Sequence, residues 1–467
     1  MNSGRMIQGL AWAIAALVSC VALAWLALVV VNRHDEAPSA DALRLEALVR
    51  DRAHLADADN GYIHLLGLAA TPDSDPGAMA IGSARAAYIE TYVAPMADDG
   101  AHAWPGRDVD YRALRGPDVA ALADACAEAR ACLEALQAHP DALARWLDSE
   151  QWLLERYRRM LATGAWREAI PSDAATPFGT LQPAIDAQKL HLLDARRQAL
   201  AGDAEAVRGL LEQDLAFWRQ VLASSDLLLT KMVAADAVTR NFAIGSLSLH
   251  ALPAAGVDAA VPPSWRRPLS AHERSLARAL AGEWHYMRGA LLSMLARDVE
   301  AALPWWRLDH QLQRPLFQPQ ATLNLSAARM VHVGEVSELP DAELGHALEA
   351  MARPRDPTPR LRVYNTVGHL SDQVASGAAY GRYIARAADL EGVRRAALLA
   401  ATLREEGVPR GDVAAAVRAA PLRQPHDDAA FEWDVARSTI VFRGLEAGDR
   451  GRHALLLQPA VDADRGS

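Results

Sequence analysis

The sequence contains little lysine, cysteine or phenylalanine and none of the common catalytic signatures. Its only two lysines are Lys189 and Lys231. It has no Gly-x-Gly-x-x-Gly opening a βαβ unit, no Walker loop, no Gly-x-Ser-x-Gly and no His-Glu-x-x-His. These absences argue against four functional classes: dinucleotide enzymes, P-loop NTPases, serine hydrolases of that type and zincin proteases. No cofactor or metal site is predicted.

An excess of positive charge is also absent. The formal net charge of the 467 residues is -10, and a nucleic-acid-binding surface needs a basic face. Nucleic acid is therefore not an expected partner. Charged residues at 23% and hydrophobic residues at 51% are typical of a globular chain. The length allows one large domain or two ordinary ones.

One long apolar run dominates the N-terminus, from Ile7 to Val31, with Gln8 and Ser19 as its only polar side chains. At about 1.5 Å per residue it is long enough to cross a hydrocarbon core roughly 30 Å thick. A signal peptide would have a shorter apolar region followed by a small-residue cleavage site. No such site follows Val31, so we predict an uncleaved anchor that contacts the lipid bilayer.

The charges around this run give opposing signals about orientation. Arg5 and the terminal amine favour a cytoplasmic N-terminus, whereas Arg33, Arg44 and the arginines that follow favour the opposite. Long domains cross largely regardless of such charges, so the short N-terminal tail carries more weight. We therefore predict a single-pass protein of the bacterial inner membrane with its body in the periplasm.

Three cysteines occur, and Cys126 and Cys132 are the two outside the apolar run. In one continuous helix, six positions separate them by about 9 Å along the axis, beyond the roughly 7 Å limit for a disulfide. The residues between them are nonetheless good helix formers. We predict a disulfide that closes a tight helical corner in an oxidising compartment. The alternative is two buried thiols on an unbroken helix.

Helical periodicity and capping signals predict an all-α body of helical hairpins. Pro183 opens a helix that runs to Leu200, and Asp203 caps the next one. Aromatic and β-branched residues predict a small β-hairpin, with strands near 431–433 and 439–442. The expected division is an anchor at 1–34, a first helical half at 35–253, a second half with the hairpin at 264–447, and a loose tail at 448–467.

Three stretches resemble one protein family. They are Asp59-Asn60-Gly61-Tyr62 leading to Leu65-Leu66-Gly67, Tyr364-Asn365-Thr366-Val367-Gly368 ahead of Tyr380 and Tyr383, and Phe431-Glu432-Trp433-Asp434 leading to Phe442-Arg443-Gly444. The family is a set of membrane-anchored envelope proteins of Gram-negative bacteria with no assigned activity. The chain departs from its pattern at Thr366, where Pro is usual, at His369, where Lys is usual, and at 425–428. The resemblance implies an inner-membrane-anchored helical protein.

A candidate ligand groove combines aromatic residues with one unusual lysine. Trp284, Trp305, Trp306 and Phe317 lie near one another in sequence and could line a groove for a peptide or glycan. The alternative is ordinary core and rim aromatics. Lys231 lies on an apolar helix in a chain that otherwise uses arginine, with Asp226 or Asp236 as a possible partner. A buried structural ammonium is the alternative for Lys231.

Two functional hypotheses follow. The first is a non-enzymatic interaction or assembly module of the bacterial envelope, with an envelope protein, peptide or glycan as its partner. The second is an envelope hydrolase or glycan-processing enzyme whose paired carboxylates face one cleft about 5–9 Å apart. A pocket that holds such a pair, with their pKa values pushed apart, would favour the enzyme.

Overall fold

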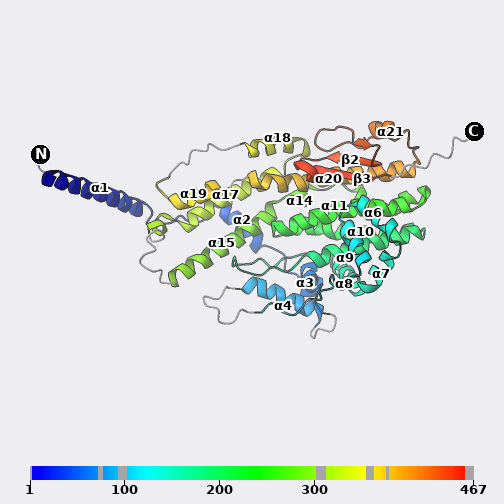
Figure 1. Cartoon of the computed structure of the whole chain (residues 1–467), viewed down its shortest axis with the longest axis horizontal. Helices are drawn as coiled ribbons and strands as arrows, with labels where there is room; N and C mark the ends of the chain where they lie inside the picture. The colour runs from blue at the N-terminus through cyan, green and yellow to red at the C-terminus, as the bar shows by residue number, and fades with distance from the viewer. Residues whose placement is uncertain are drawn as a thin grey trace, which may run out of the picture.

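The structure is a computed structural model that describes residues 3–71, 77–92, 103–300, 312–353, 362–374 and 378–457. It confirms the predicted fold class: a mainly helical chain with one N-terminal apolar helix and a small antiparallel sheet near the C-terminus. Figure 1 shows the apolar helix α1 leaving one end of an elongated body, with the sheet and the C-terminus at the other end.

Helix α1 (Ser3–Val31) contains the predicted apolar run. Its segment Ile7–Val31 has a mean hydropathy of 2.8 and is 0% buried inside the protein, so its length and composition suit a membrane span. Both indoles of α1 lie near its ends, where interfacial tryptophans are favoured. Trp12 is 77% exposed, whereas Trp25 donates its indole N–H to the Leu312 carbonyl at 3.2 Å.

Short helices form the part of the body that follows α1. They are α2 (Ala40–Arg50), η1 (Asp57–Asp59), α3 (Gly61–Leu66), α4 (Ala78–Thr91), α5 (Pro117–Ala125), α6 (Ala129–Ala138), α7 (Ala142–Ser149) and α8 (Gln151–Thr163). Helix α5 begins at a proline, which is preorganised for the first helical position. The side chain of Ser39 caps α2 by accepting the N–H of Ala42.

Three long helices form the centre of the body, as the hairpin prediction requires. They are α9 (Gln182–Leu200), α10 (Ala204–Ser224) and α11 (Leu228–Ala251). The turn between the first two contains Gly202 at φ 81, and Asp203 caps α10 by accepting the N–H of Ala206. Helix α11 packs against α9, α10 and the later helix α20, which places α11 in the middle of the molecule.

A chain of short helices connects this centre to the second half. They are η2 (Ala254–Gly256), α12 (Val257–Ala260), α13 (Pro263–Arg266) and α14 (Ala271–Arg274). The second half continues with α15 (Ala277–Glu300), η3 (Arg314–Leu316), α17 (Pro319–Ser337), α18 (Asp341–Ala352), α19 (Thr366–Val374), α20 (Ala378–Glu405) and α21 (Val413–Ala419). Helices α2, α15 and α17 pack on one another although α2 lies far away in sequence.

The predicted hairpin is part of a three-stranded antiparallel sheet in the order β1-β2-β3. Strands β1 (Glu432–Asp434) and β2 (Thr439–Arg443) pair with Trp433 opposite Ile440. The tail expected to be loose from residue 448 instead contains η4 (Gly448–Gly451) and β3 (Arg452–Leu456), which pairs with β2. Leu455, Leu456 and Leu457 are buried, and this apolar burial holds the segment in place. Residues 458–467 lie outside the described part.

Two apolar clusters fill the body. The larger runs from Tyr62 through α9, α10 and α11 to α20 and the sheet, and includes Trp146, Trp218 and Trp265. The smaller joins α2, α15, α17 and α18 to the start of α20, and Trp284 is the one tryptophan among its described members. Each cluster contains residues from both sides of the proline-rich segment 254–263. The expected halves therefore share their cores instead of having one each.

Candidate functional site

A set of hydrogen bonds locks the end of α1 to the body. Asn32 follows α1 directly and is only 4% exposed. Its side chain accepts the N–H of Asn365 at 2.7 Å and donates to the Val363 carbonyl at 2.9 Å. The Gln318 amide donates to the Asn32 carbonyl. Because these bonds saturate buried polar groups, the chain leaving α1 has a defined position on the body.

The residues after Asn32 continue this lock along α17. The Asp35 carboxylate accepts the backbone N–H groups of Gln320 and Ala321 at 2.7 and 3.0 Å, at the N-terminus of α17. A carboxylate there complements the free N–H groups and the helix dipole. Asn324 donates to the Glu36 carboxylate at 2.9 Å. We call Asn32, Asp35, Gln318, Asn324 and Asn365 the anchor lock.

The three stretches that suggested a family resemblance make close contacts between segments of this fold. In the first, Asn60 accepts the N–H groups of Tyr62 and Arg167 and donates to the Arg167 carbonyl. In the second, Asn365 is fully buried at φ 49, a region that asparagine tolerates better than most residues. In the third, a Cβ atom on Gly444 would overlap the Asp389 carboxylate. Each stretch therefore has a structural explanation.

The predicted aromatic groove is not assembled by the described residues. Trp284 is 2% exposed and donates its indole N–H to the Leu323 carbonyl at 3.1 Å, within the smaller core. Phe317 is half-buried after η3. Trp305 and Trp306 lie outside the described residues. Trp284 is therefore a core residue, which is the alternative reading stated for these aromatics.

Lys231 is a buried group that binds backbone carbonyls. It is 1% exposed, and its ammonium donates to the carbonyls of Leu222 and Glu273, the latter at 2.7 Å. These carbonyls, not the predicted carboxylates of Asp226 or Asp236, are its hydrogen-bond partners. Burial lowers the pKa of Lys231 to about 7. Lys231 thus ties the end of α10 to α14 and does not line an open groove.

Lys189 does the same at another joint, which sequence reasoning missed. Its ammonium donates to the Ala123 carbonyl at 2.6 Å, joining α9 to α5, and burial lowers its pKa. Both lysines of the chain therefore satisfy backbone carbonyls inside the protein. The rarity of lysine in this arginine-rich chain could have indicated these two positions, because an ammonium and a planar guanidinium are not interchangeable.

A buried carboxylate pair lies between the two apolar clusters. Glu168 and Asp226 are each 1% exposed, and each accepts the backbone N–H of the other, at 3.2 and 3.4 Å. Arg52 and Arg278 bind Asp226 at 2.9 Å each. Burial first, and then the charge of Asp226, raises the pKa of Glu168 to about 8. Nothing in the sequence spacing of 168 and 226 indicated this pair.

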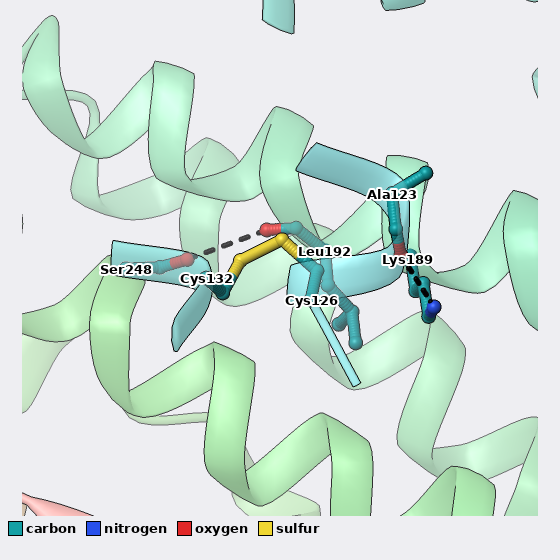
Figure 2. The surroundings of a disulfide bond; sticks show 6 residues. All are labelled: Ala123, Cys126, Cys132, Lys189, Leu192 and Ser248. Atoms are coloured by element: carbon teal, nitrogen blue, oxygen red, sulfur yellow. Dashed lines mark hydrogen bonds between the residues drawn. A yellow bond between two sulfur atoms is a disulfide. The ribbon is translucent and has the colours of Figure 1, made fainter. Parts of the chain in front are cut away.

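The predicted disulfide is present. Cys126 and Cys132 are bonded, with Cα atoms 4.2 Å apart, because the helix breaks between α5 and α6. Figure 2 shows the bond between two buried hydrogen bonds, from Lys189 to Ala123 and from Ser248 to Leu192. Both cysteines are fully buried. The prediction of a helical corner is confirmed, and the alternative of two free thiols on an unbroken helix is wrong.

The corner forms one wall of a cavity of about 430 Å³ at the end of the body far from α1. Its other wall is the sheet. The lining is mixed in charge, with three arginines, two carboxylates and small or apolar residues: Glu128, Ala129, Arg130, Arg437, Thr439, Asp449, Arg452, Ala454 and Leu456. We call it the distal cavity. Such a lining suits a polar partner that has both donors and acceptors.

Among the described residues, no group of three or more His, Cys, Asp or Glu side chains is arranged to hold a metal ion. No family model, curated protein or solved structure matches the chain. The site is therefore argued from the chain's own geometry: an anchor lock at one end, a closed carboxylate pair in the middle and the distal cavity at the other end.

Proposed function

We propose that this is a single-pass protein of the bacterial inner membrane whose helical body is an interaction or assembly module of the envelope. The observation that carries the proposal is the anchor lock. Asn32 and Asp35 bind the body through buried or helix-capping hydrogen bonds within four residues of Val31. A body attached in this way keeps one orientation relative to a membrane and presents its far end to partners.

The disulfide supports a body in the periplasm. Disulfides persist in oxidising compartments and are rare in the cytosol. Cys126 and Cys132 are both fully buried and close a short loop at the corner between α5 and α6. Arg5, on the short side of α1, supports the same orientation through the positive-inside rule.

The distal cavity supports an interaction role. It lies at the opposite end of the body from α1 (Figure 1). Arg437 and Asp449 are exposed there and form no ion pair with a described residue. Free charges of both signs at a concave surface suit an envelope protein, or a peptide or glycan carrying charged groups. The partner would be held at a fixed distance from the bilayer.

The second hypothesis, an envelope hydrolase or glycan-processing enzyme, requires two carboxylates that face one cleft. Glu168 and Asp226 are a described pair of neighbouring carboxylates, and the pKa of Glu168 is raised. Each is 1% exposed, and Asp226 is saturated by Arg52 and Arg278. A glycan has no access to such a pair, so these residues favour a structural role and the interaction module.

Two experiments test the proposal. Reporter fusions at Ser467 should give active alkaline phosphatase and dark GFP. A photo-crosslinker at Arg437 in the full-length protein should capture a defined envelope partner in intact cells. The same crosslinker at Glu155, an exposed residue of α8, is the control and should not capture that partner. A bright GFP fusion would overturn the compartment, and equal crosslinking from both positions would overturn the interaction role.

A further inference from the structure

Three arginines surround the point where α1 meets the body. Arg33 follows α1, Arg314 begins η3 and Arg362 precedes α19. All three side chains are exposed, and none forms an ion pair with a residue that the structure describes. Many arginines of the body do pair with carboxylates, as Arg115 does with Glu150 at 2.6 Å. Unpaired arginines that gather at one place have charge available for a ligand.

Hydrogen bonds of neighbouring residues fix the backbone positions of these arginines. Two residues near Arg314 in sequence form hydrogen bonds with the end of α1. Leu312 accepts the indole N–H of Trp25, and Gln318 donates to the Asn32 carbonyl. Next to Arg362, the Val363 carbonyl accepts a hydrogen bond from the Asn32 side chain. The Tyr364 hydroxyl donates to the His34 carbonyl at 3.2 Å. Segments far apart in sequence therefore bring three positive charges to one collar around α1.

The collar lies at the level of lipid headgroups if α1 crosses a bilayer. About 20 helical residues cover the roughly 30 Å hydrocarbon core, so a core that begins near Ile7 ends near Leu26. Trp25 then lies at the interface, where its indole N–H meets the Leu312 carbonyl. The headgroup layer covers roughly the next 5–8 Å. Arg33, seven residues beyond Leu26, lies about 10 Å past the core by the helical rise, just outside this layer, and a side chain of its length can reach back into it.

Among the described residues, the acidic groups near the collar accept hydrogen bonds from the body and form no ion pair with the three arginines. Asp35 accepts two N–H groups at the start of α17, and Glu36 accepts the Asn324 amide. Two apolar side chains beside the arginines remain exposed, Leu312 at 48% and Val363 at 57%. Exposed apolar side chains next to unpaired arginines match the boundary between acyl chains and anionic headgroups.

We propose that Arg33, Arg314 and Arg362 bind the headgroups of anionic phospholipids in the leaflet where α1 enters the body. The inference rests on the membrane-spanning role proposed for α1. It accounts for arginines that oppose the predicted orientation: Arg33 binds lipid at the outer leaflet. Guanidinium forks suit phosphate oxygens because they donate two parallel hydrogen bonds. The bound lipids would hold the body upright on the bilayer, in addition to the anchor lock.

The test uses the full-length protein in nanodiscs of phosphatidylcholine mixed with phosphatidylglycerol. Native mass spectrometry measures the ratio of the two lipids retained on the released protein. We expect the wild type to retain phosphatidylglycerol preferentially. Each arginine near an anionic surface contributes about fivefold, which corresponds to about 1 kcal/mol. The triple variant Arg33→Gln, Arg314→Gln, Arg362→Gln should therefore lose at least about tenfold of the preference.

The matched control replaces three exposed arginines away from the collar that also lack a described ion pair: Arg159, Arg410 and Arg418, each to Gln. It removes the same charge and should keep the lipid preference. Both triple variants should unfold at the wild-type temperature in pure phosphatidylcholine, because none of these side chains has a described ion pair to lose.

An unchanged lipid ratio in the collar variant, or an equal loss in the control, would overturn the inference. So would displacement of phosphatidylglycerol by inorganic phosphate at matched ionic strength, which would indicate a site for free phosphate. A cytoplasmic body in the reporter fusions would overturn the proposed compartment while leaving the lipid preference intact. A periplasmic body without lipid preference would overturn only the collar.

Discussion

Different interactions stabilise the two ends of the body. Next to α1, the anchor lock joins distant segments through side-chain hydrogen bonds, as Asn32 and Asn365 do. At the far end, most of the large aromatics, such as Trp218 and Phe442, pack in one core, and a disulfide closes a corner. Hydrogen bonds fix the relative orientation of the groups they join but add little net stability. Burial of apolar surface supplies most of the free energy of folding. The difference suits an end that orients the body and an end that keeps its shape.

The largest loss of stability is expected from a substitution at Asp226, at the junction of the two apolar clusters. Replacing Asp226 by Ala leaves Arg52, whose side chain is 8% exposed, without its carboxylate. Breaking a buried ion pair by removing one partner costs about 3–5 kcal/mol. Chemical unfolding of the full-length protein in detergent should show this loss.

A matched control for Asp226 is Glu335→Ala, which removes a carboxylate from an ion pair more than half exposed on both sides. It should cost no more than about 1 kcal/mol. A D226A protein as stable as E335A would contradict the role of Asp226 in joining the two clusters.

The next largest effect separates the two ends. Asn32→Ala removes the acceptor for the Asn365 N–H and leaves buried backbone groups unpaired, at a cost of about 1–3 kcal/mol. Hydrogen exchange should show lost protection at residues 363–366 and at the start of α17, with the far core unchanged.

Asn60→Ala is the counterpart at the larger cluster. Asn60 makes equivalent bonds to Tyr62 and Arg167. Its replacement should expose α3 and residues 165–167 while leaving the anchor lock protected. If both variants lost protection at the same residues, the distinction between the two ends would fail.

The disulfide should have a smaller effect, confined to the far end. Cys126 and Cys132 are six positions apart, and chain-entropy arguments give about 2 kcal/mol for so short a loop. The variant Cys126→Ser, Cys132→Ser should unfold at a lower temperature, and reductant should bring the wild type down to the same value. Cys20→Ser should keep the wild-type response to reductant. An unfolding temperature insensitive to reductant would refute the contribution of the bond.

The sequence predicted the features that depend on local patterns. The unbroken apolar run predicted α1, and Pro183 and Asp203 marked α9 and α10. The break between Cys126 and Cys132 was predicted from their spacing and from the expected oxidising compartment. The third strand was missed because β3, with the sequence Arg-His-Ala-Leu-Leu, has no β-branched residue, so its local signal is weak and its structure depends on pairing with β2.

The contacts that join distant segments could not be predicted. Glu168 and Asp226 are 58 residues apart, and Asn32 and Asn365 are 333 apart. No periodicity relates such positions, because tertiary packing alone brings them together. Trp284 shows the converse error: its closeness in sequence to other aromatic residues suggested a groove, but its indole N–H has a partner within the core.

The smallest effect is a pH dependence at the junction of the two clusters. The folded pKa of Glu168, about 8, lies above its ordinary value of 4.5, so the folded state holds a proton that the unfolded state releases. The contribution of Glu168 to stability should therefore fall as pH rises from 5 to 6, by at most about 1.4 kcal/mol, whereas His250, with a folded pKa of about 3, contributes in the opposite direction. Lys231, with a folded pKa of about 7, opposes this trend only above that pH. Glu168→Gln should remove this contribution, so the unfolding free energy of the wild type minus that of E168Q should fall between pH 5 and pH 6. If the unfolding free energy of E168Q kept the wild-type dependence on pH, another group would hold the proton. The junction of the two clusters would then have no pH dependence of its own.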